Sequence, residues 1–411
     1  MVSFPTSAKV VIVGAGIVGN SVAYHLANLG WKGILLIDKG PLPNPGGSTG
    51  HASNFIYLVD HNKEMAALTI ESARQYRDWG VFTECGGLEV ARSETRMDEL
   101  RRRMDSAKNW GIDDARLVTP AEIQELVPFI DASILVGGFY TPGVGVCDSL
   151  QFGTLCREKA EAMGALTVFA STEVTGFGVQ GGRVRSVQTT RGSVEAEYVV
   201  IACGVWSPLI AEMAGSHIPL TPVVHQMIDV GPVPIFQQTA GEITFPIVRD
   251  VDTNMYERQN GSGFEVGSYA HRPILMEADD IPSIAASALS PTELPFTQED
   301  FELQMEQALE LVPDILGDER VGIAVAQAQG ERAWVLLLGL AARWRNRGIG
   351  SALLAELERR LRALGVRRIG ALLAPGAVGA VALQNSEYRA LGGLTYFEKV
   401  EQLGAADAGV L

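Results

Sequence analysis

The chain has 411 residues, 47% of them hydrophobic and 20% charged, which is a globular composition with enough length for two or three domains. Its formal net charge of -15 disfavours binding to nucleic acid or to anionic membranes, and no run of eighteen apolar residues predicts a membrane span. The start of the chain lacks a signal-peptide pattern and its four cysteines are scattered, so we expect a reduced, cytoplasmic protein.

The first predicted element is a buried parallel strand at residues 10–13, which runs into a glycine-rich turn and a helix that ends near Leu29. The turn has the pattern G-x-G-x-x-G. Its glycines permit a tight turn, a close backbone approach to a pyrophosphate, and close packing of helix on strand. The first N–H groups of the helix would point at the phosphates. The residues expected at this cradle are Gly14, Gly16, Ile17, Val18 and Gly19.

Residues 33–38 predict the second strand, which ends at Asp38. A carboxylate at this place accepts hydrogen bonds from a ribose diol and would repel a 2′-phosphate, so NADP is disfavoured. Together the strands, glycines, helix and acid indicate a dinucleotide-binding unit, although this pattern alone does not choose between NAD and FAD. The alternative is a structural βαβ unit that binds no ligand.

A loop rich in glycine and proline follows, and it contains the segment 47–52 with the sequence GSTGHA. This segment resembles the G-S-T-x-H-A segment of the dimethylglycine oxidase, dimethylglycine dehydrogenase and sarcosine dehydrogenase group, within the D-amino-acid-oxidase-like FAD enzymes. The resemblance implies FAD as the cofactor and implies a covalent bond between His51 and a flavin methyl group. Alternatively, His51 is a non-covalent flavin contact or a surface residue. Further cofactor contacts implied here are Lys39, Gly47, Ser48, Thr49 and Ala52.

Helical periodicity continues along the next part of the chain. Thr119, Pro120 and Glu122 form a helix start in which a threonine cap, a proline at the first helical position and a glutamate three residues after the cap coincide. The other expected elements are helices at 64–79, 96–110 and 149–163 and a strand at 134–140.

Strands are expected next at 166–169, 172–177 and 183–189, and the apolar run 198–202 indicates a return to the buried parallel sheet. In the resembled group, the backbone at the position of Val174 meets the adenine, and the segment matching residues 202–207 passes the cofactor again. The resemblance therefore adds cofactor contacts at Val174, Ala202, Gly204 and Trp206.

A substrate-binding sheet is expected at about residues 217–300, with strands at 223–228, 245–250, 255–258 and 263–273. The resemblance makes His225 and Tyr256 the candidates for a catalytic histidine and tyrosine beside the flavin, although relatives often have tyrosine where Met227 stands. Each of these side chains is otherwise a half-buried, packed strand residue. Arg258 either pairs with a substrate carboxylate or is a solvated strand charge.

A helix that ends near Leu311 is expected after a capped start at 294–301, and the resemblance runs from residue 8 to about residue 321. The resembled enzymes then have a D-G-x-P-x-x-G segment before a helix that stabilises reduced flavin, and this chain lacks it. The departure puts turnover in doubt and leaves open a non-catalytic flavin-binding fusion protein.

The C-terminal stretch has a different charge pattern. From Arg343 to Arg368 it carries eight arginines and only two acids, inside an acidic chain. Arg345, Gly348 and Gly350 resemble the phosphate-binding turn of GNAT-type N-acetyltransferases, with a strand before it, a helix to about Leu364 and a strand at 368–373. Only the second half of that fold is matched. The resemblance implies acetyl-CoA binding, whereas the alternative is a solvated basic helix face.

The sequence thus predicts an α/β fold, with a Rossmann-like parallel sheet and a mixed substrate sheet in residues 1–321 and a partial GNAT-like domain in residues 322–411. The first functional interpretation is an FAD-dependent oxidoreductase that oxidises N-methyl amino acids such as sarcosine or dimethylglycine. The alternatives are an acetyl-CoA-dependent N-acetyltransferase and a non-catalytic flavin-binding fusion. We expect no metal site; the electron acceptor, dioxygen or an electron-transfer flavoprotein, and the oligomeric state stay open.

Overall fold

The computed structural model describes residues 3–60, 62–236, 241, 243–287, 290–313, 322–340, 349–373, 383–384, 386, 388–391 and 395–400. The chain forms two compact units, and it crosses between them several times. The first unit comprises residues 1–85, 143–225 and 273–295, and the second comprises residues 86–142, 226–272 and 296–411. Neither unit is therefore one continuous segment of the sequence.

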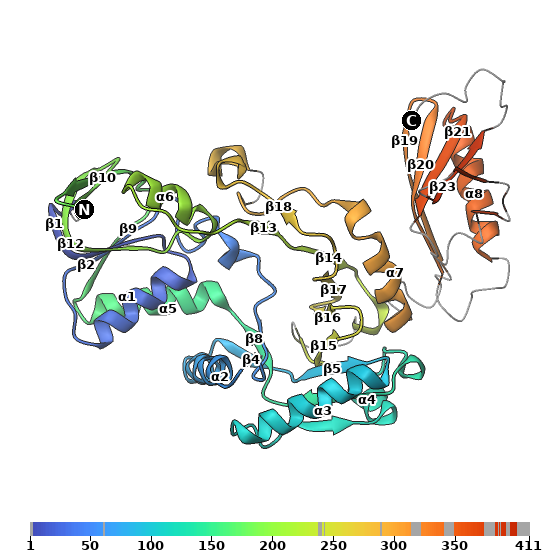
Figure 1. The fold of residues 1–411 in the computed structure, drawn as a ribbon, viewed down its shortest axis with the longest axis horizontal. Coiled ribbons are helices and arrows are strands. Elements are labelled where there is room, and N and C mark those ends of the chain that lie inside the picture. The colour runs from blue at the N-terminus through green and yellow to red at the C-terminus, as the bar shows by residue number, and fades with distance from the viewer. Residues whose placement is uncertain are drawn as a thin grey trace. The chain divides into compact units, whose positions relative to one another are not determined.

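The first unit is organised on a six-stranded sheet with the order β10-β11-β12-β1-β2-β9. The strand β1 is parallel to β12 on one side and to β2 on the other, and β2 is parallel to β9. The helices α1 and α5 lie beside each other against this sheet (Figure 1). The bounds are β1 Ser7–Val13, α1 Ile17–Asn28, β2 Ile34–Ile37, α5 Ser149–Ala162, β9 Leu166–Phe169, β10 Val174–Gln180, β11 Arg183–Thr189 and β12 Gly192–Ile201.

The apolar run of β1 is explained by burial of both faces of the sheet. Val10 and Ile12 join a core cluster with residues of α1 and α5, whereas Val11 and Val13 join a cluster on the other face. Successive strand residues point to opposite faces, so a strand covered on both sides must be apolar throughout.

Shorter elements complete the first unit. A three-stranded sheet has the order β3-β8-β4, and β13 pairs with β18. The bounds are η1 Ser48–Gly50, β3 Phe55–Ile56, α2 Lys63–Asp78, β4 Phe82–Glu84, β8 Gly145–Cys147, η3 Gly204–Trp206, α6 Ser207–Met213, β13 Val223–Val224, β18 Ile274–Leu275, η5 Ala278–Asp280 and η6 Ile284–Ala286.

The second unit contains a seven-stranded sheet with the order β14-β17-β16-β15-β5-β7-β6. Three of its strands come from residues 87–141, ahead of the stretch 217–300 in which the substrate sheet was expected. The strand β15 joins the two groups because it pairs in parallel with β5. The bounds are β5 Gly87–Ala91, α3 Glu94–Asn109, β6 Arg116–Val118, α4 Pro120–Leu126, η2 Ala132–Ile134, β7 Gly137–Thr141, β14 Gln226–Val230, η4 Pro234–Phe236, β15 Ile247–Asp250, β16 Met255–Asn260, β17 Gly263–Ser268, η7 Gln298–Asp300 and α7 Glu302–Leu311.

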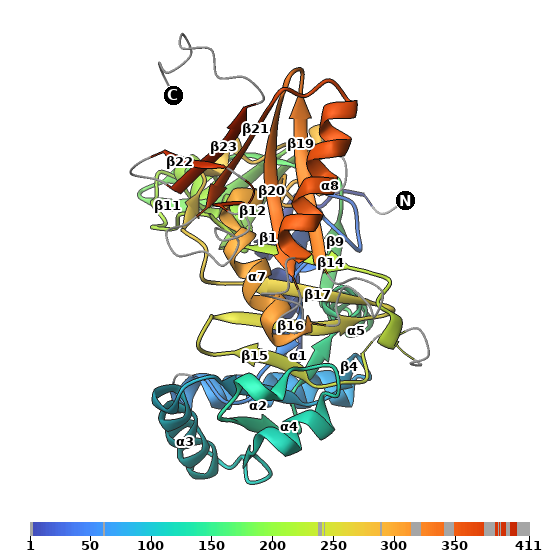
Figure 2. The ribbon, with the colours of Figure 1, turned by 90° about the vertical axis from the view of Figure 1, so that its right-hand side faces the viewer.

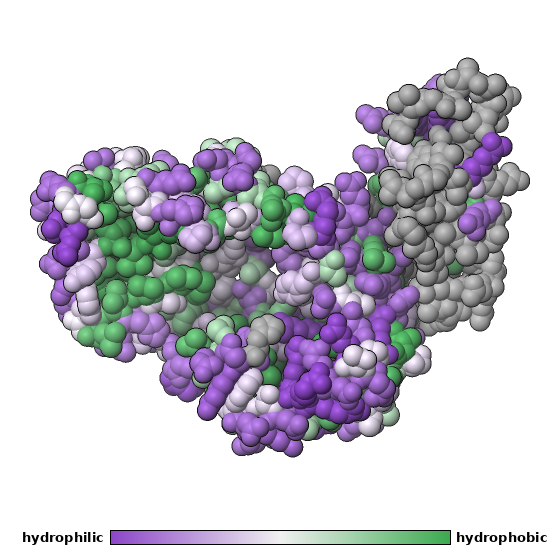
Figure 3. Space-filling view, viewed as in Figure 1, coloured by the Kyte–Doolittle hydropathy of each residue, from purple (hydrophilic) through white to green (hydrophobic). Residues whose placement is uncertain are grey.

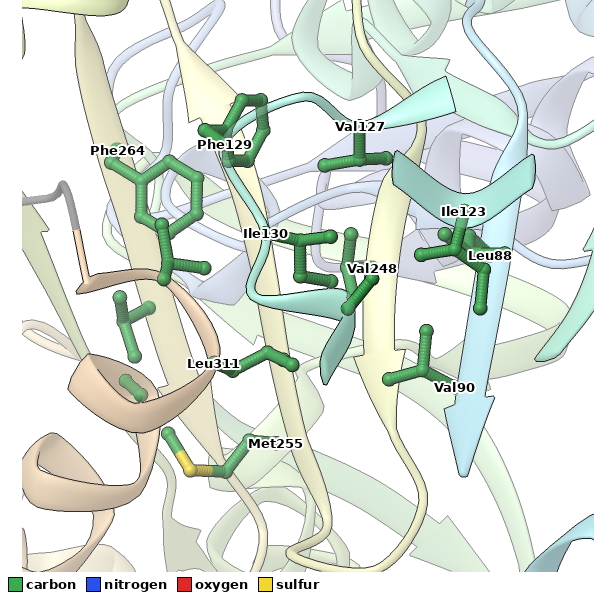
Figure 4. Close-up of a cluster of buried hydrophobic side chains, with 14 of the residues drawn as sticks. Leu88, Val90, Ile123, Val127, Phe129, Ile130, Val248, Met255, Phe264 and Leu311 are labelled. Carbon is green, nitrogen blue, oxygen red and sulfur yellow. The ribbon is translucent and has the colours of Figure 1, made fainter. Parts of the chain in front are cut away.

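One face of this sheet packs on an apolar cluster, shown in Figure 4. Leu88 and Val90 of β5, Met255 of β16 and Phe264 of β17 meet Leu311 at the end of α7 there. Phe264 is stacked on Phe236 with ring centroids 5.8 Å apart. Tyr256 of β16 is adjacent to Met255 and therefore points to the opposite face of the sheet.

Residues 322–400 include a further five-stranded sheet with the order β19-β20-β21-β23-β22. The strands β20 and β21 are parallel and are connected through α8, which contacts β19 and β20 (Figure 2). The expected strand–helix–strand unit is therefore present. The bounds are β19 Gly322–Gln329, β20 Arg332–Leu340, α8 Ile349–Ala363, β21 Arg368–Leu373, β22 Arg389–Leu391 and β23 Thr395–Val400.

Three predicted elements differ from the structure. The stretch expected as a strand at 134–140 begins as a 3-10 turn, and β7 starts only at Gly137. The strand expected at 223–228 is two strands in different sheets, β13 and β14, with His225 between them. The capped helix start at 294–301 is also wrong, because α7 begins at Glu302 after Phe301, which offers no side-chain cap.

The capping box at Thr119 is confirmed in full. Its hydroxyl accepts from the Glu122 N–H, and the Glu122 carboxylate accepts from the Thr119 N–H at 2.8 Å. Thr119→Ala should therefore lower the free energy of unfolding by about 1 kcal/mol, as measured by urea denaturation. Thr69→Ala, which changes a partly exposed threonine inside α2, is the matched control and should cost less than about 0.5 kcal/mol. Equal losses for the two variants would contradict the role of the cap.

Within the described residues, none of the helices combines the length and the apolar character needed to cross a lipid bilayer.

Candidate functional site

The first unit contains a cavity of about 480 Å³ at the carboxyl ends of β1 and β2. This volume lies in the range of small-molecule and cofactor sites. Hydrophobic residues show green on the surface of this unit in Figure 3. The lining includes Val13, Gly14, Gly16, Ile17, Val18, Asp38, Lys39, Pro45, Gly47, Ser48, Thr49, Ala52, Asn54, Ser149, Thr172, Glu173, Val174, Ala202, Cys203, Gly204, Val205, Trp206, Leu209, Ile210, Met213 and Ile284.

The glycine turn has the close contacts that its pattern predicts. Gly14 has φ +104°, and a Cβ there would lie 2.3 Å from the Ala202 carbonyl oxygen. At Gly19 a Cβ would lie 1.8 Å from the Gly14 carbonyl oxygen, which is impossible without separating helix from strand. Gly16 is the N-terminal cap residue of α1 and lines the cavity. The N-terminus of α1 therefore opens on the cavity without side chains in the way.

Asp38 joins the turn to the next loop. One of its carboxylate oxygens accepts from the Ala15 N–H at 2.6 Å and the other accepts from the Gly40 N–H at 2.7 Å. Burial raises the pKa of Asp38, and the two backbone hydrogen bonds oppose this rise. Each carboxylate oxygen accepts more than one hydrogen bond, so the group retains acceptor capacity toward the cavity that it lines.

The segment 47–52 is fixed against α1 by Thr49. Its hydroxyl accepts from the Ile17 N–H at 3.0 Å, and its carbonyl accepts from the Ser149 hydroxyl at 2.7 Å. Thr49 thereby satisfies one of the free N–H groups at the start of α1. The hydroxyl and backbone of this segment are thus positioned by both α1 and α5.

The chain passes the cavity a second time at residues 202–206. The Ala202 N–H donates to the Val13 carbonyl at 2.8 Å, and Gly204 has φ +54°. The Lys39 ammonium lies 5.2 Å from the ring centroid of Trp206. The Cys203 thiol donates to the Val13 carbonyl at 3.2 Å, and burial raises its pKa to about 12, so this thiol is a packed, protonated group.

His51 is half-buried and does not line the cavity, although its neighbours Thr49 and Ala52 do. Its Nε2 lies 2.5 Å from the Thr292 hydroxyl oxygen. Burial lowers the pKa of His51, and the nearby Glu293 carboxylate opposes this effect. Burial therefore favours the neutral form of this imidazole.

Several lining residues were not foreseen from the sequence. Leu209, Ile210 and Met213 of α6 form an apolar part of the lining, and Ile284 and Thr172 come from distant segments. The spacing of the three α6 residues on one helix face, directly after the segment 202–206, is the signal that could have identified them.

The candidate catalytic residues lie in different units, and each differs from the half-buried expectation. His225 is exposed at the end of β13 in the first unit. Tyr256 of the second unit is 1% exposed. Its ring covers Gly267, where a Cβ would lie 2.0 Å from Cζ, and its hydroxyl lies 3.7 Å from the Met227 sulfur.

Arg258 is not a solvated charge. It is 7% exposed and donates to the Glu265 carboxylate at 2.8 Å on the neighbouring strand. Its Nε and Nη1 have no hydrogen-bond partner in the described part of the chain. A buried guanidinium with free N–H groups has capacity for a further acceptor, and Arg258 points to the same face of β16 as Tyr256.

Only one of the three residues expected to bind acetyl-CoA lies in the described part of the chain. Gly350 is buried in the first turn of α8, whereas Arg345 and Gly348 lie outside the described residues. Among the described residues, no group of three or more histidine, cysteine, aspartate or glutamate side chains is arranged to hold a metal ion.

Known proteins that resemble this chain are FAD-dependent oxidoreductases, which agrees with a cavity of cofactor size. A family described as FAD dependent oxidoreductase matches residues 9–382, a span that continues past residue 321. Mitochondrial sarcosine dehydrogenase of Homo sapiens is 32% identical over 288 residues, which cover 66% of this chain and 30% of that protein. Mitochondrial dimethylglycine dehydrogenase of Mus musculus is 30% identical over 269 residues, which cover 64% of this chain and 30% of that protein.

The chain thus matches less than a third of the length of these curated relatives. Among solved structures, L-proline dehydrogenase from P. horikoshii superposes with a TM-score of 0.63 at 24% identity. The superposition covers 75% of this chain and 78% of that one. It shows a shared mixed α/β fold.

Proposed function

Because the chain belongs to the family of FAD-dependent oxidoreductases, we propose that it binds FAD in the cavity of the first unit and oxidises an N-methyl amino acid of the sarcosine or dimethylglycine type. One observation carries the proposal. The glycine turn, Asp38 and four residues of the segment 47–52 all line one cavity of about 480 Å³; the four are Gly47, Ser48, Thr49 and Ala52. These are the groups that a pyrophosphate, a ribose and a flavin ring require.

Each part of the cavity has a distinct task in this proposal. The N-terminus of α1, left open by Gly14 and Gly16, binds the pyrophosphate through backbone N–H groups. Asp38 accepts from the ribose hydroxyls. The backbone at Val174 faces the adenine, and the second pass at residues 202–206 lies along the cofactor. The apolar residues of α6 exclude water from this side.

When bound, FAD would accept a hydride from the N-methyl carbon of the amine, and the substrate imine would then take up water to give the demethylated amine and formaldehyde. The chain supplies orientation and charge. We propose Tyr256 as a residue that orients the substrate and His225 as a residue that handles a proton in the reaction. Arg258 is the candidate partner for the substrate carboxylate.

We also propose that His51 is the covalent attachment point. A neutral imidazole has one nitrogen with a free lone pair, and burial lowers the pKa of His51 so that this neutral form is present at neutral pH. Its neighbours Thr49 and Ala52 line the cavity, so the residue lies next to the proposed flavin position.

The test is the visible absorption spectrum of the purified protein, repeated after acid precipitation. Yellow colour that stays with the precipitated wild type and is released from His51→Ala supports both FAD binding and the attachment. Sarcosine and dimethylglycine are then added without oxygen. Bleaching of the flavin and formaldehyde release are expected, and the reoxidation rates with dioxygen and with an artificial electron acceptor distinguish oxidase from dehydrogenase.

Other outcomes would reject parts of the proposal. Colour released from wild type would remove the covalent role of His51 but keep FAD. A flavin that no amine bleaches would favour a non-catalytic flavin-binding protein. A colourless folded protein would reject the oxidoreductase function.

We propose acetyl-CoA binding by residues 322–400 as a second candidate function. The parallel β20–α8–β21 connection favours it, because the N-terminus of a helix after a strand is a common pyrophosphate site. Calorimetric titration with CoA tests it, and absence of heat at millimolar CoA would reject it.

A further inference from the structure

The hairpin of β16 and β17 places an ion pair on the sheet face that is turned away from the apolar cluster. Phe264 and Val266 belong to that cluster, so Glu265, which lies between them, points to the opposite face. Arg258 is directly opposite Glu265 in the register of the hairpin and donates to its carboxylate at 2.8 Å. Arg258 is 7% exposed and Glu265 is 2% exposed, so both charges are shielded from bulk water.

The two side chains do not satisfy each other's hydrogen-bonding capacity. Within the described residues, Nε and Nη1 of Arg258 and Oε1 of Glu265 have no hydrogen-bond partner. Asp229, which is opposite Glu265 on β14, accepts from the Asn260 side chain at 3.0 Å. Buried charged atoms without partners cost folding free energy, and a bound molecule can supply the missing partners. The pair therefore offers two nitrogen donors and one carboxylate oxygen to a ligand.

The donors and the acceptor of this pair match the two ends of an amino acid. The ligand carboxylate accepts from the Arg258 guanidinium, and the positively charged nitrogen of the ligand is attracted to the Glu265 carboxylate. The ion pair has no net charge, so a zwitterion adds none to this buried position. A lone carboxylate or a lone amine would leave an uncompensated charge there, which is costly. The pair therefore favours a ligand that carries both charges.

An aromatic ring lies on the same face as the ion pair. Tyr256 precedes Arg258 by two residues, so both side chains point to one side of β16. The ring of Tyr256 covers Gly267, which is two residues from Glu265 on β17. A carboxylate and an aromatic ring on one surface are the groups that attract methylated ammonium, because both are negative toward the cation.

We propose that Glu265 is a specificity-determining residue, which selects a positively charged, methylated nitrogen while Arg258 binds the carboxylate of the same ligand. This inference rests on the proposed oxidation of an N-methyl amino acid. It adds that the substrate is recognised as a zwitterion and names the residue that recognises its nitrogen. A neutral amine becomes a cation at nitrogen when hydride leaves, so the same carboxylate also favours that step.

Two ligands of the same shape test the role of charge at the nitrogen. Trimethylglycine has a permanently charged nitrogen without a lone pair, so it binds but is not oxidised, and 3,3-dimethylbutanoate has a carbon atom in that place. Calorimetric titration of the whole chain measures both affinities. Wild type should bind trimethylglycine about tenfold or more tightly than 3,3-dimethylbutanoate. Glu265→Gln should lose this preference but bind 3,3-dimethylbutanoate at least as tightly as wild type, because the charge of Arg258 is then unbalanced.

Asp229→Asn is the matched control, because it removes an exposed carboxylate from the strand next to Glu265. It should keep the wild-type preference for trimethylglycine. A double variant, Arg258→Met with Glu265→Met, removes both charges together, so that neither is left buried alone. It should remain folded, as measured by urea denaturation, and should bind neither ligand measurably.

The outcomes separate this inference from the proposal on which it rests. Equal weakening of both ligands by Glu265→Gln would indicate a purely structural ion pair and overturn the inference, as would equal affinity of wild type for the two ligands. If N-methyl amino acids bleach the flavin of wild type but neither ligand binds, the oxidation stands and the inference is overturned. If no amine bleaches the flavin but a preference for trimethylglycine exists and depends on Glu265, the recognition holds and the proposed oxidation fails.

Discussion

Gly14→Ala is expected to abolish flavin binding. The alanine would need φ near +104°, a conformation that costs an L residue about 1–2 kcal/mol, and its Cβ would lie 2.3 Å from the Ala202 carbonyl oxygen. The Gly14 turn and the Ala202 carbonyl cannot separate independently, because the Ala202 N–H donates to the Val13 carbonyl at 2.8 Å. The second pass of the chain would have to separate from the turn, and both line the cavity. The absorbance ratio of flavin to protein measures the loss.

Gly30→Ala is the control for this prediction. Gly30 also has a positive φ, +86°, but a Cβ there has no atom within 4 Å, and the residue does not line the cavity. This variant should lose about 1 kcal/mol of unfolding free energy and keep its flavin. Retention of flavin by Gly14→Ala, or equal flavin loss in both variants, would show that the turn is not the cofactor cradle.

The glycine turn could be predicted from the sequence because its geometry is local. Gly14, Gly16 and Gly19 act through the backbone within one turn of each other, and Asp38 follows at the end of the next strand. The pattern of a buried strand, three glycines and an amphipathic helix leaves little freedom for the fold. The carboxylate at Asp38 and the N-terminus of α1 therefore lie where the sequence predicts them.

The seven-stranded sheet of the second unit was harder to predict because its strands are ordered by tertiary contacts. Its strand β15 pairs in parallel with β5, which is far earlier in the chain, and no local pattern specifies that pairing. The burial of Arg258 follows from its neighbour Glu265 across the β16–β17 hairpin. A charged residue in a strand is most often solvated, so the sequence alone left that interpretation of Arg258 open.

The contact between His51 and Thr292 illustrates the same limit at the cofactor loop. The segment 47–52 identifies His51, but nothing in its own sequence shows which side chain meets the imidazole. Thr292 lies in a stretch of turns with no periodicity, and only the fold of the first unit brings it to Gly46 and His51. A contact of this kind carries no motif, because any hydroxyl at the correct place can make it.

Glu257→Gln is expected to change how stability depends on pH. Glu257 lies on the core face of β16, between Val248 and Val266, and is 1% exposed. Neither carboxylate oxygen has a hydrogen-bond partner in the described part of the chain. Burial raises the pKa of Glu257 well above its ordinary value, and the Asp250 carboxylate raises it further, whereas Arg92 opposes the rise. The raised pKa therefore favours the protonated, uncharged carboxyl in the folded protein.

The direction of the effect follows from the proton balance. Unfolding releases the Glu257 proton whenever the pH exceeds the ordinary glutamate pKa, so the free energy of unfolding falls as the pH rises. The slope is at most about 1.4 kcal/mol per pH unit, and it applies between the ordinary glutamate pKa and the raised pKa of the folded protein. Glutamine does not titrate, so Glu257→Gln should lose this slope and gain stability relative to wild type at the higher pH.

Urea denaturation from pH 5 to pH 8 measures this difference, with Glu197→Gln as the control because Glu197 is an exposed residue of β12. The control should keep the wild-type slope. If wild type and Glu257→Gln change in parallel over this range, then Glu257 is ionised in the folded protein. In that case the Arg92 guanidinium, which already pairs with Asp250 at 2.6 Å, would have to compensate a second buried carboxylate, and removing its charge should then destabilise the second unit more strongly at high pH than at low pH.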